Sequence, residues 1–211
     1  MFEWHSALAG GVSAGGRDGV RGGRQLRLTE VRGWHLAQLA VFAQQQSEFQ
    51  ERLSALSGAQ LPEELYRGVT HNDSRLVRIT PQQYWWFAAS NASMVRLARE
   101  LPPSAGTVTL LSAGRVRVRI AGPNARDVLA KGIPLDLHTK AFQVGQSAQT
   151  GLHHTGVFLE RVADDGYEIY VPRSYAAWLW EWLIDAALPF GYDIMVEAPA
   201  PTSNNSESHQ P

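Results

Sequence analysis

The chain has 211 residues, a hydrophobic content of 44% and a formal net charge of -1. This length is enough for one folded domain or two small halves. The near-neutral charge argues against nucleic acid or an anionic membrane surface as a partner. The sequence has no cysteine, which excludes disulfides, thiolate zinc sites and a catalytic cysteine. No apolar run reaches the roughly eighteen residues of a membrane span, and residues 1–11 lack the pattern of a signal peptide, so we expect a cytoplasmic protein.

The chain is unusually rich in arginine relative to lysine, and it is rich in tryptophan. The basic residues are nearly all arginines, with Lys131 and Lys140 as the lysines, and there are seven tryptophans. Both residue types are enriched in the buried parts of protein interfaces. This composition is equally typical of a partner-binding protein and of a protein with a large aromatic core.

The two ends of the chain differ in composition from its middle. Residues 1–25 are predicted to form an arm, because 10–25 are rich in glycine and poor in apolar side chains. Phe2, Trp4 and Leu8 give this arm a small hydrophobic tip, suited either to a neighbouring protein or to its own domain. Residues 197–211 are mostly polar, with several prolines, so we predict a disordered tail. A single folded domain then spans 26–196.

The first half of this domain, 26–103, alternates strands and helices. Ser47 and Gln50 stand at capping-box spacing before a helix that Gly58 would end. A second helix is expected after Ser90 or Asn91. The strands are expected at 26–32, 35–42, 75–79 and 84–88.

The second half, 107–196, repeats this order. Its expected helices are 124–131 and 175–188, and its expected strands are 107–111, 115–121, 155–162, 167–171 and 192–196. The order predicts an α+β fold of two ferredoxin-like β-α-β-β-α-β half-repeats related by a pseudo-twofold axis.

Several local patterns resemble known sites or contacts. Ser13 lies in a G-x-S-x-G pattern, but the flanking strand and helix that a catalytic serine needs are not predicted. His153 and His154, if they lie on a strand, point to opposite faces and cannot hold one metal ion together. Trp180 is predicted on the polar side of the last helix, either as an interface anchor or as a tolerated exposed tryptophan.

Two stretches of the second half together carry a family resemblance. They read AGPNARDVLAKGIPLDLH and GLHHTGVFLERVADDGYEIYVPRSYAAWLWEWL. They resemble the gamma subunit of bacterial heterotetrameric sarcosine oxidase, over about residues 26–196. More distantly, the GPNA turn and the HTG…GYEI hairpin are similar to the folate-binding domain of glycine-cleavage aminomethyltransferases, which implies the same pair of half-repeats.

The closer resemblance implies a non-catalytic subunit. It implies a complex that oxidatively demethylates sarcosine to glycine and hydrogen peroxide and forms methylene-tetrahydrofolate. FAD, FMN, NAD, zinc and tetrahydrofolate would belong to the alpha, beta and delta partners. The resemblance to the distant family implies that Asp73 and Glu168 match folate-binding positions and are the candidates for a cofactor site. We expect no catalytic or metal-binding residue, and the alternative is a stand-alone folate-binding or aminomethyltransferase-like protein.

Overall fold

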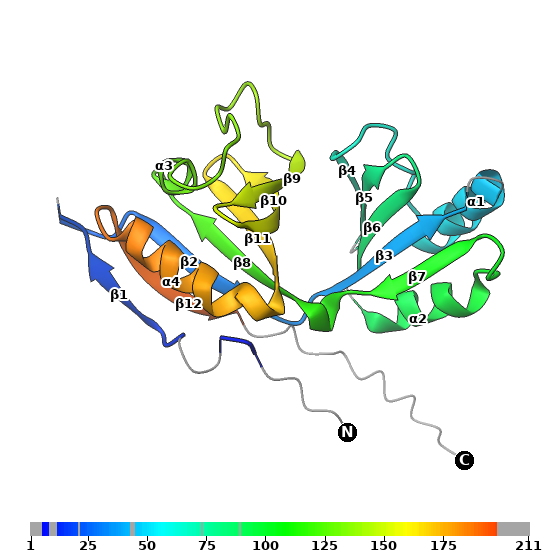
Figure 1. Cartoon of the computed structure of the whole chain (residues 1–211), viewed down its shortest axis with the longest axis horizontal. Coiled ribbons are helices and arrows are strands. Elements are labelled where there is room, and N and C mark those ends of the chain that lie inside the picture. The colour runs from blue at the N-terminus through cyan, green and yellow to red at the C-terminus, as the bar shows by residue number, and fades with distance from the viewer. Residues whose placement is uncertain are drawn as a thin grey trace, which may run out of the picture.

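Two β-sheets form the body of the protein, with helices on their outer sides (Figure 1). The computed structural model describes residues 6–8, 12–20, 22–42, 45–72, 74–88 and 90–197. The α+β class predicted from the element order is confirmed. No helix within these ranges has the length and hydrophobicity needed to cross a membrane.

The larger sheet has seven strands and is antiparallel except where β12 runs parallel to β2. Helices α3 (Ala125–Leu129) and α4 (Ala176–Ala187) cover one face of it. Across the sheet the strands are β1 (Gly15–Asp18), β12 (Gly191–Glu197), β2 (Leu26–Val31), β8 (Arg115–Ala121), β11 (Gly166–Pro172), β10 (Thr155–Ala163) and β9 (Ser147–Leu152).

The smaller sheet has five antiparallel strands and is covered by α1 (Gln46–Ser57) and α2 (Asn91–Glu100). Its strands, in order across the sheet, are β4 (Gly68–His71), β5 (Ser74–Thr80), β6 (Gln83–Ala88), β3 (His35–Val41) and β7 (Gly106–Leu110). The chain order β3-α1-β5-β6-α2-β7 follows the predicted β-α-β-β-α-β succession, as does β8-α3-β10-β11-α4-β12.

The two sheets do not divide the chain at the expected boundary between 103 and 107. Strand β2 lies in the seven-stranded sheet, between β12 and β8, while β7 completes the five-stranded sheet. Leu26 and Leu28 of β2 pack into the core beneath α3 and α4. Alternation along a strand predicts which face is buried, but the partner strand is chosen by packing elsewhere in the molecule.

Part of the glycine-rich arm is an ordered edge strand rather than a loop. Strand β1 pairs antiparallel with β12. A side chain at Gly16 would place its Cβ 2.7 Å from the carbonyl oxygen of Tyr192, so the strand approaches closely only because glycine is there. Leu8 is buried in the core of the seven-stranded sheet, so this part of the tip packs on its own domain. Phe2, Trp4 and the tail from 198 lie outside the described residues.

Helix ends agree only partly with the sequence signals. Gly58 ends α1 in the left-handed conformation, at φ 68°, as predicted. The capping box is wrong, because α1 already begins at Gln46, after Gln45, and no side chain caps it. Ser47 therefore lies inside the first turn of the helix.

Helix α4 buries Trp180, which the sequence pattern places on the polar side of the helix. Leu179, Trp180 and Leu183 are buried against the seven-stranded sheet, whereas Trp178 and Trp182 are half-buried beside it. Trp180 is only 2% exposed, so it is not a surface anchor. An almost wholly apolar helix offers several possible inward faces, and its sequence alone does not select one.

A third hydrophobic cluster joins the two sheets. It contains Leu36, Val77, Ile79, Trp85, Phe158 and Tyr170, drawn from both sheets. The sheet faces that carry no helices therefore pack against each other, and this contact between the sheets holds the polar residues described next.

Candidate functional site between the two sheets

Strand β8 directs a row of arginines toward the five-stranded sheet. Its sequence RVRVRIA alternates, so Val116, Val118 and Ile120 enter the helix-covered core. Arg115, Arg117 and Arg119 lie on the opposite face. The space between the sheets is thus lined on one side by three guanidinium groups.

Glu168 is the centre of a buried ionic cluster on the neighbouring strand β11. It is 1% exposed, and its carboxylate accepts hydrogen bonds from Arg117 (Nη2 at 2.7 Å, Nε at 2.8 Å) and Arg119 (Nη2 at 2.7 Å, Nε at 3.0 Å). The Tyr170 hydroxyl donates a further bond of 2.9 Å. Both carboxylate oxygens of Glu168 are therefore occupied by groups of this chain.

The charge state of Glu168 follows from these contacts. Burial raises the pKa of its carboxyl, but the charge and hydrogen bonds of Arg117 and Arg119 outweigh burial and hold the pKa below its ordinary value. Burial also raises the pKa of the Tyr170 hydroxyl, which stays a donor. The cluster is consequently a carboxylate neutralised by fixed cations.

A second buried carboxylate links the two sheets directly. Glu160 of β10 lies 2.5 Å from Nη1 of Arg75, which comes from β5 in the other sheet. Arg75 also donates a 3.3 Å hydrogen bond to the carbonyl of Gly145. Burial, with a smaller contribution from nearby Glu168, raises the pKa of Glu160 to about 7, against the opposing effect of Arg75. This pair is an ionisable contact at the junction of the sheets.

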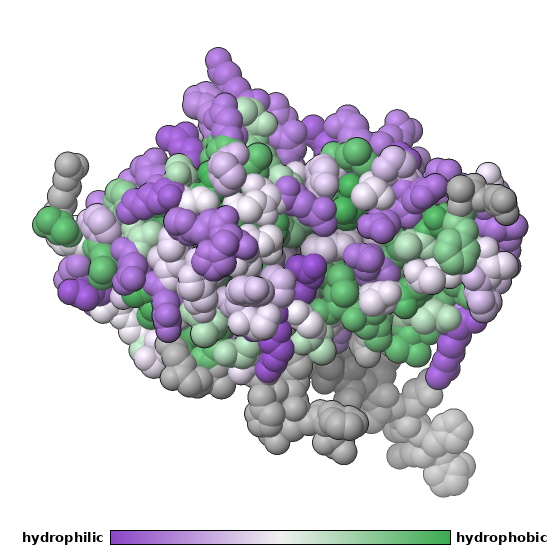
Figure 2. Space-filling model, in the orientation of Figure 1, coloured by the Kyte–Doolittle hydropathy of each residue, from purple (hydrophilic) through white to green (hydrophobic). Residues whose placement is uncertain are grey.

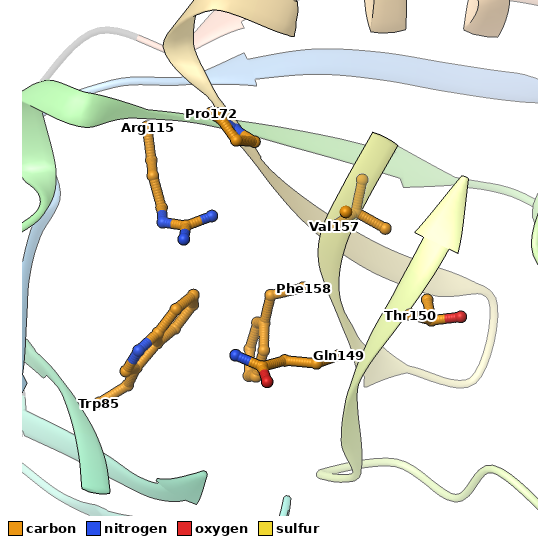
Figure 3. Close-up of a pocket in the computed structure, with 8 residues that line it drawn as sticks. Trp85, Arg115, Gln149, Thr150, Val157, Phe158 and Pro172 are labelled. Atoms are coloured by element: carbon orange, nitrogen blue, oxygen red, sulfur yellow. The ribbon is translucent and has the colours of Figure 1, made fainter. Parts of the chain in front are cut away.

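A cavity of about 400 Å³ opens beside this cluster (Figure 3). Arg115, Trp85 and Phe158 turn toward it from three different strands. The guanidinium carbon of Arg115 lies 4.8 Å from the centre of the Trp85 ring, and the Trp85 and Phe158 rings are 4.5 Å apart. Burial lowers the pKa of Arg115. The remaining lining residues are Gln149, Thr150, Gly156, Val157 and Pro172.

The adjacent histidines lie in a turn and not on a strand. Leu152 pairs with Thr155, so His153 and His154 form a two-residue hairpin turn, with His153 at φ 50°. Both imidazoles contact Trp178, at ring distances of 6.1 Å and 5.0 Å, and His153 also contacts Trp182 at 5.7 Å. In the described ranges, no group of three or more histidines or carboxylates is arranged to hold a metal ion.

The structure places the candidate residues predicted from the sequence in different environments. Glu168 lies in the ionic cluster, while Asp73 lies outside the described residues, so its distance from Glu168 is not defined. Ser13 is exposed and is followed by the edge strand β1, so the helix that a serine nucleophile needs does not follow it. Sequence reasoning missed the arginine row and Arg75, although the regular Arg-x-Arg-x-Arg alternation of β8 marks a charged strand face.

Comparison with known proteins gives the class first. The GCVT N-terminal domain family matches residues 64–196, and by this match the chain belongs to that family. A glycine cleavage system aminomethyltransferase T from Bartonella henselae has the same fold, with a TM-score of 0.59 and 19% identity over 82% of this chain and 48% of that one.

Closer relatives define the particular group. The sarcosine oxidase subunit gamma of Corynebacterium sp. (strain U-96) is 30% identical over 175 residues, which cover 81% of this chain and 83% of the relative. The corresponding Arthrobacter protein is 29% identical over 140 residues, 65% of this chain and 69% of its own length. A heterotetrameric sarcosine oxidase structure from Corynebacterium sp. U-96 matches with a TM-score of 0.76 and 26% identity, over 89% and 96% of the two chains. The chain belongs to the sarcosine oxidase gamma subunit family.

Proposed function

We propose that this chain is the architectural, non-catalytic gamma subunit of a heterotetrameric sarcosine oxidase. The complex would oxidatively demethylate sarcosine to glycine and hydrogen peroxide and form methylene-tetrahydrofolate. Its alpha, beta and delta subunits would carry FAD, FMN, NAD, zinc and tetrahydrofolate, and the complex would work in the cytoplasm. The family membership supports the assignment to such a complex.

The non-catalytic role is supported by one observation: both carboxylate oxygens of Glu168 already accept hydrogen bonds from side chains of this chain. In the resemblance to aminomethyltransferases, this position supplies a glutamate to the folate site. Here Arg117, Arg119 and Tyr170 make five hydrogen bonds to the Glu168 carboxylate. A pterin would have to displace these charge-assisted bonds, which are among the strongest that proteins form. A buried structural ion cluster accounts for Glu168 without any ligand.

An exposed apolar surface supports a partner-binding role. In the view of Figure 2, hydrophobic residues gather over the five-stranded half, in the region of α2 and β7. Leu110, on the edge strand β7, is 50% exposed, and Phe42, just after β3, is 47% exposed. Exposed apolar residues on a sheet edge mark a surface that partner chains commonly cover.

Co-purification tests this proposal. The full chain, tagged and expressed with the alpha, beta and delta subunits, should bring down flavin-coloured larger subunits at fixed stoichiometry. The chain purified alone should not turn over sarcosine. Failure of the larger subunits to follow, or turnover by the single chain, would contradict the proposal.

The alternative function is a stand-alone folate-binding protein. It is motivated by the aminomethyltransferase fold and by Glu168, and it requires the arginines to release that carboxylate. Calorimetric titration of the purified chain with tetrahydrofolate separates the two functions. We expect no binding, and micromolar affinity that disappears in Glu168→Gln would favour the alternative.

A further inference from the structure

Among the described arginines of β5 and β8 that lie between the two sheets, Arg115 has no carboxylate partner. Arg75 is paired with Glu160, and Arg117 and Arg119 share Glu168. Within the described part of the chain, Arg115 has no carboxylate at ion-pair distance and contacts the Trp85 ring instead. A partly buried guanidinium is stabilised more by a carboxylate than by an indole face alone.

The surroundings of Arg115 are shaped for a chain segment rather than for an enclosed small molecule. Its cavity is half-open, with Gln149 and Thr150 at the side of the edge strand β9. Small-molecule sites commonly bury most of their ligand, which an open hollow cannot do. Trp85 and Phe158 add an aromatic wall against which an apolar side chain packs.

We propose that this hollow, defined by Trp85, Arg115, Gln149 and Phe158, receives an aspartate or glutamate side chain from another subunit of the complex. The carboxylate would pair with Arg115, and the adjoining residues of that segment would pack on the two aromatic rings. An acidic side chain is the occupant whose charge complements that of Arg115, which contacts the Trp85 ring and has no carboxylate beside it within the described residues. This inference rests on the proposed function and adds to it the place and chemistry of one subunit contact.

Charge reversal at Arg115 tests the contact in the assembled complex. Arg115→Glu should reduce recovery of the larger subunits with the tagged chain by about tenfold or more, because a like charge then meets the partner's carboxylate. The matched control is Arg126→Glu on α3, on the helix-covered face of the seven-stranded sheet, where the arginine side chain is 47% exposed. That variant should recover the partners as the wild type does.

A cross-linking measurement keeps the test independent of folding. A photoreactive benzoyl-phenylalanine replacing Gln149, at the edge of the hollow, should attach to a peptide of a partner subunit that contains Asp or Glu. The proposal is overturned if Arg115→Glu retains the partners as well as Arg126→Glu does, or if the cross-linked peptide carries no acidic residue. Absence of any cross-link to a partner would overturn it as well. If the wild-type chain itself recovers no partners, the proposed function fails instead.

Discussion

Glu160 makes the stability of the protein depend on pH. Its pKa in the folded protein is about 7, above the ordinary value of 4.5, mainly because of burial. The folded state then binds the proton more tightly than the unfolded state. The stabilisation is complete below about pH 4.5 and is lost as the pH rises through about 7, by roughly 3 kcal/mol.

Glu160→Gln should remove this dependence. The amide keeps a hydrogen-bond acceptor for Arg75 but has no proton to lose. Urea unfolding midpoints of the full chain, measured between pH 5 and pH 8, should fall more steeply for the wild type than for the variant. The exposed Glu181→Gln serves as the control and should follow the wild type. Parallel pH curves for wild type and Glu160→Gln would show that the carboxyl does not titrate in this range.

At the scale of the elements, strand β1 depends on a single glycine. A methyl group at Gly16 would lie 2.7 Å from the Tyr192 carbonyl, whereas nothing lies within 4 Å of the same position at Gly15. Gly16→Ala should therefore loosen the pairing of β1 with β12, at a local cost of about 1–2 kcal/mol, while Gly15→Ala should not. Hydrogen exchange of the backbone amides in 15–18 measures this. Equal protection in the two variants would mean that β1 shifts without cost.

The sequence predicts the elements better than it predicts their partners. Helix α4 and the hairpin of β10 and β11 follow from apolar periodicity and from the Asp164-Asp165-Gly166 turn, and the structure has both. Strands β1 and β9 were missed because their residues are small or polar, and they are strands because a neighbouring edge accepts them. Pairing is a long-range property, which local patterns do not encode.

The candidate site was less predictable than the fold, for the same reason. Glu168 came only from the family resemblance, and nothing local to it indicates that Arg117 and Arg119 occupy its carboxylate. Arg75 and Glu160 meet because two sheets built from different parts of the chain pack together. In the local sequence, the alternation of arginine along β8 indicates a charged strand face. It does not indicate which side chains contact those arginines.

At the scale of the whole molecule, aromatic packing couples the two sheets. Phe158 of β10 is 1% exposed and contacts Trp85 and Phe87 of the five-stranded sheet at ring distances of 4.5 Å and 6.5 Å. Phe158→Ala should cost about 3–5 kcal/mol, through lost burial and the cavity that remains. Phe49→Ala removes a ring of the same size from the core between α1 and the five-stranded sheet, and should cost a similar amount.

Phe158→Ala and Phe49→Ala should differ in whether the two sheets still unfold together. Because Phe158 lies between the sheets, its loss should let one sheet open without the other. Hydrogen exchange should then show two groups of strands with different opening free energies. One group would contain β5 and β6, and the other would contain β8 and β11. Loss of Phe49 weakens one sheet internally and leaves the contact between the sheets intact, so it should lower the opening free energy of both groups together. Hydrogen exchange by mass spectrometry on the full chain compares the variants directly. If Phe158→Ala preserves one common opening free energy, the buried pair of Arg75 with Glu160 is sufficient to keep the sheets acting as a unit.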